Sequence, residues 1–442
     1  MRLYGTMKID NNGVLNIGGI STVELVNKYG SPIIVMDEEE IRNNMRKYIE
    51  AFDEYYPNSK TAYAGKAFIN RTLCKIIDDE GLGLDVVSGG ELYTALQADF
   101  PAEKIYFHGN NKTLFEIKMA LDAEIGKFMV DNLQEAYLIN DLADKPVEVI
   151  LRVTPGIEAH THEFIQTGQL DSKFGVSIYR DQALAVIKEI IEMDNLILTG
   201  IHAHIGSQIF NLSSFAKAII VMMEFMAEIR EKTGLTLKEL DIGGGLGIAY
   251  TKEEDNPSVV EYAKIIAEEV KRQSEILDFP QPVIINEPGR SIVGTAGTTL
   301  YTIGTIKDIP SIRKYIAIDG GMTDNIRPAL YDANYEAAIA NKAEQETKEM
   351  VTVAGKCCES GDILIKDIKL QEAETGDVLA VSCTGAYTYA MASNYNGVTR
   401  PAVVLVYKGK DDLIIKRESN EDLIKNDIIP DRFQEKEVSL QY

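Results

Sequence analysis

The most regular feature of the chain is a series of short apolar runs, each followed by small or polar residues and then by a helix-like segment. Eight such runs occupy residues 60–68, 82–91, 104–111, 127–132, 147–156, 198–208, 237–247 and 282–290. Between them, apolar residues recur at helical spacing, as in Leu73, Ile76 and Ile77, and Gly234 is a stop signal. Eight alternations of strand and helix predict an α/β fold, a TIM-like (β/α)8 barrel. A doubly wound open sheet is the structural alternative.

The pattern changes after about residue 300, where short β-rich runs separated by turn signals replace the helical periodicity. These runs lie at residues 314–321, 348–355, 376–387 and 400–419. They predict a second, all-β domain, a β-sandwich or barrel. Two apolar stretches in the first 35 or so residues, "GVLNIGGIS" and "SPIIVMD", are expected to pack against it and complete it. The predicted division is a barrel domain at 36–298 and a β domain made of 1–35 and 299–442.

Composition narrows the classes of partner. The 442 residues carry a formal net charge of -23, which disfavours nucleic acids and anionic membranes. No run approaches the length of a membrane span, and the first residues have no apolar signal-peptide region, so a cytoplasmic protein with a small-molecule substrate is expected. The four cysteines, Cys74, Cys357, Cys358 and Cys383, form no CxxC pair, which fits a reducing compartment. No metal site is predicted.

Chemistry gathers at the carboxyl ends of the predicted strands, which is where barrel enzymes hold their active sites. The polar residues found there are Lys66, Asp85, Ser88, Glu91, His108, Asn110, Arg152, His202, His204, Ser207, Glu287 and Arg290. The seventh run ends in the glycine cluster "GGGLG" at residues 243–247.

Three of these features together describe a pyridoxal phosphate site. Lysines are usually surface cations, but the apolar "TAYAG" before Lys66 favours an interior lysine whose lowered pKa suits a Schiff base. The glycine cluster could be a tight turn or a phosphate cradle, and the loops after strands 7 and 8 favour the cradle. Glu287 could pair with a protonated ring nitrogen, and Arg290 could add a charged donor.

Ten motifs in order carry a resemblance to a known family. They are "YAGKA", "DVVSGGEL", "HGNNK", "RVTPGIEAHTHEFIQTGQLDSKFG", "HAHIGSQI", "DIGGGLGI", "EPGRSIV", "IRPALY", "CCESGD" and "GAYTYAMASNYN". From about residue 15 to 430, the chain resembles the diaminopimelate decarboxylases, within the fold-type III pyridoxal-phosphate decarboxylases. The resemblance implies pyridoxal 5'-phosphate as the cofactor, held covalently by Lys66. It implies further cofactor contacts from Asp85, His204, Ser207, Gly244, Gly245, Glu287, Arg290 and Tyr387. Without their surrounding motifs, His204 would be interpreted as a buried core histidine, and Arg327 as a partner in a surface ion pair.

The resemblance also implies a substrate and a reaction, the decarboxylation of meso-2,6-diaminopimelate to L-lysine and CO2 as the last step of lysine biosynthesis. Its substrate-binding residues are Arg290, Arg327, Tyr331, Glu359 and Tyr387. Pro328 is expected to hold Arg327 in an extended conformation. The alternatives are a decarboxylase of another basic amino acid or of a carboxynorspermidine-like substrate, and a homologue that binds without catalysis.

The pair Cys357–Cys358 could be a vicinal disulfide, a packing pair, or one working thiol beside a bystander. Adjacent Cα atoms are too close for an unstrained disulfide. The resemblance selects Cys358 as the catalytic proton donor, supplied by the neighbouring subunit of a homodimer with shared sites. Because Cys358 and Glu359 would then serve one pocket, their segment is expected to be a bend. The sequence departs from the family pattern at Gly65, at Phe68 and at the inserted Lys356 and Cys357, which concerns the fine shape of the pocket.

Overall fold

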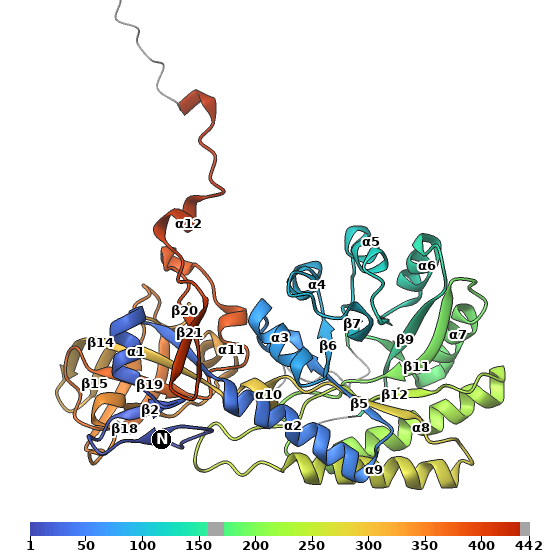
Figure 1. The fold of residues 1–442 in the computed structure, drawn as a ribbon, viewed down its shortest axis with the longest axis horizontal. Coiled ribbons are helices and arrows are strands. Elements are labelled where there is room, and N and C mark those ends of the chain that lie inside the picture. Colours follow the sequence, from blue (N-terminus) through green and yellow to red (C-terminus); the bar gives the residue numbers. More distant parts are fainter. Residues whose placement is uncertain (158–171, 434–442) are drawn as a thin grey trace, which may run out of the picture.

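In the computed structural model, which describes residues 1–157 and 172–433, eight parallel strands form a closed barrel (Figure 1). Strand β13 pairs with β5, and β8 pairs with β9, so the sheet has no open edge. The predicted barrel is confirmed and the open sheet is wrong. Residues 158–171 of the long "RVTPG" motif lie outside the described residues. The barrel strands are β5 (Ser59–Ala64), β6 (Gly83–Val86), β7 (Ile105–Phe107), β8 (Lys127–Val130), β9 (Val147–Thr154), β11 (Leu196–His202), β12 (Glu239–Asp241) and β13 (Val283–Asn286).

Helices cover the outside of the barrel and bury its main apolar core against the strands. The helix that ends at Thr233 stops where predicted, because Gly234 adopts the left-handed conformation (φ 78°) and donates its N–H to the Arg230 carbonyl. The barrel helices are α2 (Glu38–Tyr55), α3 (Arg71–Asp79), α4 (Gly89–Leu96), α5 (Leu114–Asp122), α6 (Leu133–Leu142), α7 (Gln182–Ile190), α8 (Ser213–Thr233) and α9 (Val259–Ile276).

A separate small cluster of buried residues fills the barrel interior. Its members come from five different strands and are Ala62, Tyr106, Met129, Ile150 and Ile285. Because the interior is packed, ligands can bind only at the rim, beyond the strand ends.

The second part of the molecule is a separate β-sheet structure that takes in the N-terminal segment. Strand β4 (Ile33–Asp37) lies between β14, to which it is antiparallel, and β20, to which it is parallel. Figure 1 shows the blue N-terminal elements among the orange and red strands of this part. The contribution of the N-terminal segment is thereby confirmed. The other strands are β14 (Gly297–Ile309), β15 (Arg313–Ile318), β16 (Ala337–Ile339), β17 (Glu349–Ala354), β18 (Ile363–Leu370), β19 (Val378–Ser382), β20 (Ala402–Tyr407) and β21 (Lys410–Ile415).

Several short elements complete the fold. The first residues add a three-stranded sheet, β1 (Lys8–Ile9), β2 (Leu15–Ile17) and β3 (Ile20–Ser21), followed by α1 (Thr22–Tyr29). The barrel rim continues into α10 (Arg290–Val293), and the β part contributes α11 (Arg327–Tyr331) and α12 (Asn420–Ile424). Among the described helices, none is both long and apolar enough to cross a membrane.

Candidate active site

A cavity of about 700 Å³ opens at the C-terminal rim of the barrel, where the β part packs against it. Its wall contains residues from both parts of the molecule, because loops after the barrel strands meet α11 and the segment that follows β19. Ten of the predicted site residues line it, namely Lys66, His204, Ser207, Gly244, Gly245, Glu287, Arg290, Arg327, Tyr331 and Tyr387. Arg152, Asn110 and His108, noted at strand ends without a role, line it too.

Lys66 follows β5 directly, in a single 3-10 turn (η1, Gly65–Ala67), and its side chain is exposed to the cavity. The protein around the Lys66 amine partly desolvates it and so lowers its pKa, but the interactions with Asp85, Tyr387 and Glu287 outweigh this and raise the pKa above its ordinary value. The prediction of a lowered pKa is therefore wrong for the chain alone. The sequence could not show it, because the opposing carboxylates come from β6 and from the end of β13.

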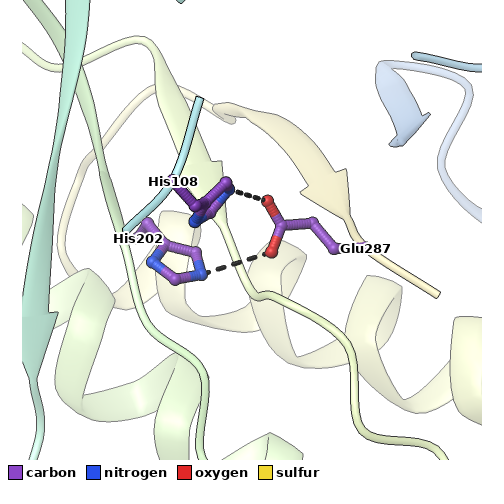
Figure 2. A group of neighbouring side chains, drawn as sticks. All are labelled: His108, His202 and Glu287. Carbon is purple, nitrogen blue, oxygen red and sulfur yellow. Dashed lines mark hydrogen bonds and ion pairs between the residues drawn. The ribbon is translucent and has the colours of Figure 1, made fainter. Parts of the chain in front are cut away.

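Glu287 lies between two histidines from different strands (Figure 2). Its Oε1 is 2.6 Å from Nε2 of His108, and its Oε2 is 3.4 Å from Nε2 of His202. A second carboxylate, Asp85, has its Oδ1 3.7 Å from His108 Nε2. Both oxygens of Asp85 are buried, and neither makes a hydrogen bond within the described residues. The structure thus gathers two acids and two bases in one buried group.

The histidines set the charge of Glu287. Burial would raise the pKa of Glu287, but His108 and His202 bring it well below the ordinary value, so the carboxylate is ionised at neutral pH. Burial lowers the pKa of His202 to about 3, which leaves this ring neutral. Burial likewise lowers the pKa of His204, a half-buried residue of the cavity wall, well below the ordinary value. An ionised Glu287 is the partner that a protonated ring nitrogen needs.

The same three side chains also have the spacing of a metal site. The ligand atoms of His108, His202 and Glu287 all lie within 4.8 Å of one another. Carboxylate and imidazole are metal ligands, so the geometry by itself fits either a cation or the ring of a cofactor. The choice between a cation site and a cofactor site therefore depends on the rest of the cavity.

In the glycine cluster, Gly244 and Gly245 stand at positions where no other residue type would fit. A Cβ at Gly244 would lie 2.1 Å from the Glu287 carbonyl oxygen, and one at Gly245 would lie 2.3 Å from the Gly206 carbonyl oxygen. Gly245 also has a φ of 117°, which favours glycine. Because Gly244 and Gly245 also line the cavity and carry no side chain, an anionic group can approach their main chain, as phosphate sites require. Ser207, on the facing loop, accepts a hydrogen bond from Nη2 of Arg290 at 3.1 Å.

Arg290 and Arg327 both reach one hydroxyl. Nη1 of Arg290 donates to the Tyr250 hydroxyl at 2.5 Å, and Nη1 of Arg327 donates to it at 2.9 Å and to Tyr335 at 2.7 Å. Both arginines are buried, and no carboxylate of the described chain pairs with either. Two uncompensated cations at the end of a cavity predict an anionic ligand.

The predicted extended conformation of Arg327 is wrong. Arg327 is the first residue of the short helix α11, with Pro328 in the first turn. A proline is tolerated there because the first helical N–H groups have no intrahelical partner. The N–H of Arg327 instead donates to the Asn325 side chain at 3.3 Å.

Tyr387 joins the β part to the catalytic turn of the barrel. It has a left-handed backbone (φ 58°), and its N–H donates to the Ala67 carbonyl at 2.8 Å. This bond places Tyr387 next to Lys66, and the Arg290 guanidinium lies 4.7 Å from the Tyr387 ring centre. A non-glycine residue held in this conformation indicates a backbone fixed by its surroundings.

Three predicted residues are not part of the cavity wall of their own chain: Asp85, which is buried beside His108, and Cys358 and Glu359, which lie away from the cavity. Cys358 and Glu359 are exposed in the connection between β17 and β18, and neither is part of the cavity wall. The expected bend is confirmed, because residues 356–358 are bends and 360–361 a turn. The Cys358 N–H donates to Asn396 at 2.7 Å, and the Cys357 N–H donates to Asp362 at 2.8 Å. All four cysteines are free thiols, so the vicinal disulfide is absent from the described chain.

Gly65 and Phe68, two of the departures from the family pattern, are not part of the cavity wall. Phe68 is buried and packs edge-on against Tyr389, with ring centres 6.1 Å apart, outside the cavity wall. Gly65 permits a close approach, since a Cβ there would lie 2.9 Å from the Asp85 carbonyl oxygen.

Sequence reasoning missed Tyr250, the residue that links the two arginines. The available signal was weak, namely an aromatic residue three positions after Gly247 in a loop expected at the rim. Its partner Tyr335 belongs to none of the motifs, so the sequence offers no signal for it. Only the packing of α11 against the barrel loop brings them together.

The barrel, the lysine at the end of its first strand and the glycine cluster are the features of a pyridoxal phosphate site, and comparison with known proteins makes this chain a pyridoxal-dependent decarboxylase. A family model described as pyridoxal-dependent decarboxylase, pyridoxal binding domain, matches residues 39–294. Diaminopimelate decarboxylase of Bacillus subtilis (strain 168) is 48% identical over 431 residues, which cover 97% of this chain and 98% of the relative. That of Bacillus methanolicus is 50% identical over 420 residues, covering 94% and 97%.

Solved structures agree with these sequences. The crystal structure of diaminopimelate decarboxylase from M. jannaschii in co-complex with L-lysine matches with a TM-score of 0.91 and 39% identity, covering 96% of this chain and 98% of that one. The chain belongs to the diaminopimelate decarboxylase family.

Pyridoxal 5'-phosphate is the cofactor of this family, and the cavity fits it. Gly244 and Gly245 line the cavity without side chains, as a phosphate site requires, the ionised Glu287 suits a protonated ring nitrogen, and Lys66 is accessible from the cavity. The group of His108, His202 and Glu287 therefore belongs to a cofactor site rather than to a separate metal centre.

Proposed function

We propose that this protein decarboxylates meso-2,6-diaminopimelate to L-lysine and CO2, the last step of lysine biosynthesis. The observation that carries the proposal is the pair of buried arginines, Arg290 and Arg327, at the end of the cavity that holds Lys66. A substrate that keeps a second carboxylate far from the reacting carbon has a partner there. Ornithine, by contrast, has a single carboxylate, which the reaction removes, so it has no second carboxylate for the two arginines to bind.

The family resemblance suggests a role for each cofactor-binding residue, and the place of most of them on the cavity wall supports these roles. Lys66 would hold the cofactor covalently, Gly244, Gly245 and Ser207 would hold its phosphate, and Tyr387 would add its hydroxyl. His204 would lie against the ring, and Asp85 would be a supporting polar group. Glu287, which is ionised, would accept the ring N–H. The bound cofactor supplies an electron sink for the electrons left on Cα when the carboxylate departs.

The substrate residues orient the far end of the molecule. Arg290, Arg327 and Tyr331 hold the distal carboxylate, Tyr387 flanks the reacting end, and Glu359 accepts hydrogen bonds from the distal ammonium. Because that end is zwitterionic, it needs both a cation and an anion from the protein. The buried arginine supplies the first with little reorganisation, since its hydroxyl partners already fix it.

The active protein is a homodimer with shared sites. Cys358 and Glu359 act on substrate, yet in one chain they lie outside its cavity, so a second chain has to deliver them. The Cys358 thiol of one subunit returns a proton to Cα in the cavity of the other. A reducing, cytoplasmic location remains a prediction that fits the four free thiols.

A substrate panel tests the proposed reaction. With pyridoxal phosphate present, kcat/KM for meso-diaminopimelate is expected to exceed that for ornithine, lysine and arginine by at least about 10⁴-fold, because the buried arginines would otherwise stay unpaired. Coupled CO2 detection measures all four rates. A preference for ornithine, lysine or arginine would support the alternative of another basic amino acid instead.

A further inference from the structure

Tyr250 occupies a position that neither the motifs nor the family's substrate residues include. It follows the glycine cradle in the barrel loop, is 5% exposed, and borders the cavity. Its ring packs edge-on against Tyr335, with ring centres 5.4 Å apart and planes at 86°. The Arg327 guanidinium lies 4.9 Å from its ring centre. The ring is therefore held on two sides by the β part, while its backbone belongs to the barrel.

The Tyr250 hydroxyl accepts two hydrogen bonds from cations. A phenol has one hydrogen to donate and can accept two bonds. Arg290 and Arg327 take both acceptor positions. Within residues 1–157 and 172–433 the hydroxyl donates to no other group, so its hydrogen is left for a ligand.

The arginines themselves also have unused donors. Nε of Arg290 and Nε of Arg327 are both buried and have no hydrogen-bond partner. Buried donors of this kind are rarely left unpaired in a working protein. Two guanidinium groups on either side of one oxygen also repel each other, and an anion between them relieves that repulsion.

We propose that Tyr250 is a specificity-determining residue that donates its hydroxyl hydrogen to the distal carboxylate of the substrate and holds Arg290 and Arg327 as one carboxylate receptor. The inference rests on the proposed function and adds to it a residue and a reason for discrimination. A ligand without that carboxylate gains nothing from the hydroxyl. The cofactor phosphate is also anionic, and the test below separates the two.

The test compares two ligands that differ only by the carboxylate. L-lysine carries it, and cadaverine is the same molecule without it. In the Tyr250→Phe holoenzyme, the dissociation constant for L-lysine, measured by titration calorimetry, is expected to rise about tenfold or more, as for the loss of a hydrogen bond to a charged group. The constant for cadaverine is expected to change less than about twofold, since it makes no such bond.

Tyr335→Phe is the matched control, because it removes one hydroxyl bonded to Arg327 and leaves Arg290 untouched. It is expected to raise the lysine constant by about threefold, within the range of one such bond. Equal losses for lysine and cadaverine in Tyr250→Phe would overturn the inference. So would a loss confined to pyridoxal phosphate affinity with an unchanged lysine-to-cadaverine ratio.

A wild-type crystal structure with L-lysine provides a second measurement if the Phe variant does not fold. The carboxylate is expected within about 3.2 Å of the Tyr250 hydroxyl, and a carboxylate bound elsewhere refutes the inference. The two proposals fail separately. A wild-type protein that makes no lysine refutes the function, whereas an active protein that is insensitive to Tyr250→Phe refutes only this inference.

Discussion

A Lys66→Ala variant is expected to lose decarboxylation by about 10⁴-fold or more, the scale observed when a covalent catalytic group is removed. Lys66 lies in the cavity wall, and the proposed function assigns the covalent bond to the cofactor to its amine. The visible absorbance of the lysine-bound cofactor is expected to disappear as well. Steady-state rates and an absorbance spectrum of the purified variant measure both effects.

Lys60→Ala is the matched control for this variant. Lys60 lies in the same strand, β5, and its half-exposed side chain reaches Glu239 at 3.4 Å, away from the cavity. Its loss is expected to leave the rate within about twofold, because Lys60 is half-exposed and Glu239 keeps its ion pair with Lys127. Retention of both the absorbance and turnover in Lys66→Ala would show that another residue carries the cofactor.

The second large effect is expected at Cys358. A Cys358→Ala variant removes the proposed proton donor and is expected to lower kcat by about 10²–10⁴-fold, the usual contribution of general acid catalysis. Cys357→Ala is expected to stay within about threefold, as for a residue without a catalytic role. Burial and the neighbouring Asp362 raise the pKa of the Cys357 thiol to about 11, and its own N–H is held by Asp362. If Cys357→Ala is the damaging change, the active thiol is one residue earlier.

Mixing the two inactive variants tests whether the sites are shared. In a dimer of one Lys66→Ala chain and one Cys358→Ala chain, one cavity has both an intact lysine and an intact thiol from its partner. Random exchange of subunits in a two-fold dimer is expected to restore about a quarter of the wild-type activity. Mixtures that stay inactive after exchange would place the thiol and the lysine of each site in the same chain.

The sequence predicted the barrel well because each parallel strand is buried on both faces and therefore reads as a continuous apolar run. It named no strand at residues 297–309, although β14 occupies all 13 of them. The first half of β14 is buried and the second half largely exposed, so neither alternation nor a single apolar run marks it. Its pairing with β4, more than 250 residues earlier, is a tertiary contact that a local pattern does not contain.

The sequence predicted site residues whose position follows from the end of one strand. It did not predict properties that depend on two residues from distant segments. Lys66, Glu287 and the glycines stand at strand ends, so their positions follow from the barrel. The raised pKa of Lys66 depends on Asp85 and Glu287 across the rim, and the Tyr250 bridge depends on two separate loops. Charge and hydrogen bonding between distant segments require the folded chain.

The most direct test of the central claim is product analysis with meso-2,6-diaminopimelate as the only amino acid. The purified chain, supplied with pyridoxal 5'-phosphate, is expected to release L-lysine and CO2 in equal amounts, measured by mass spectrometry and carbon dioxide capture. Unchanged diaminopimelate, or any product other than L-lysine, would contradict the account.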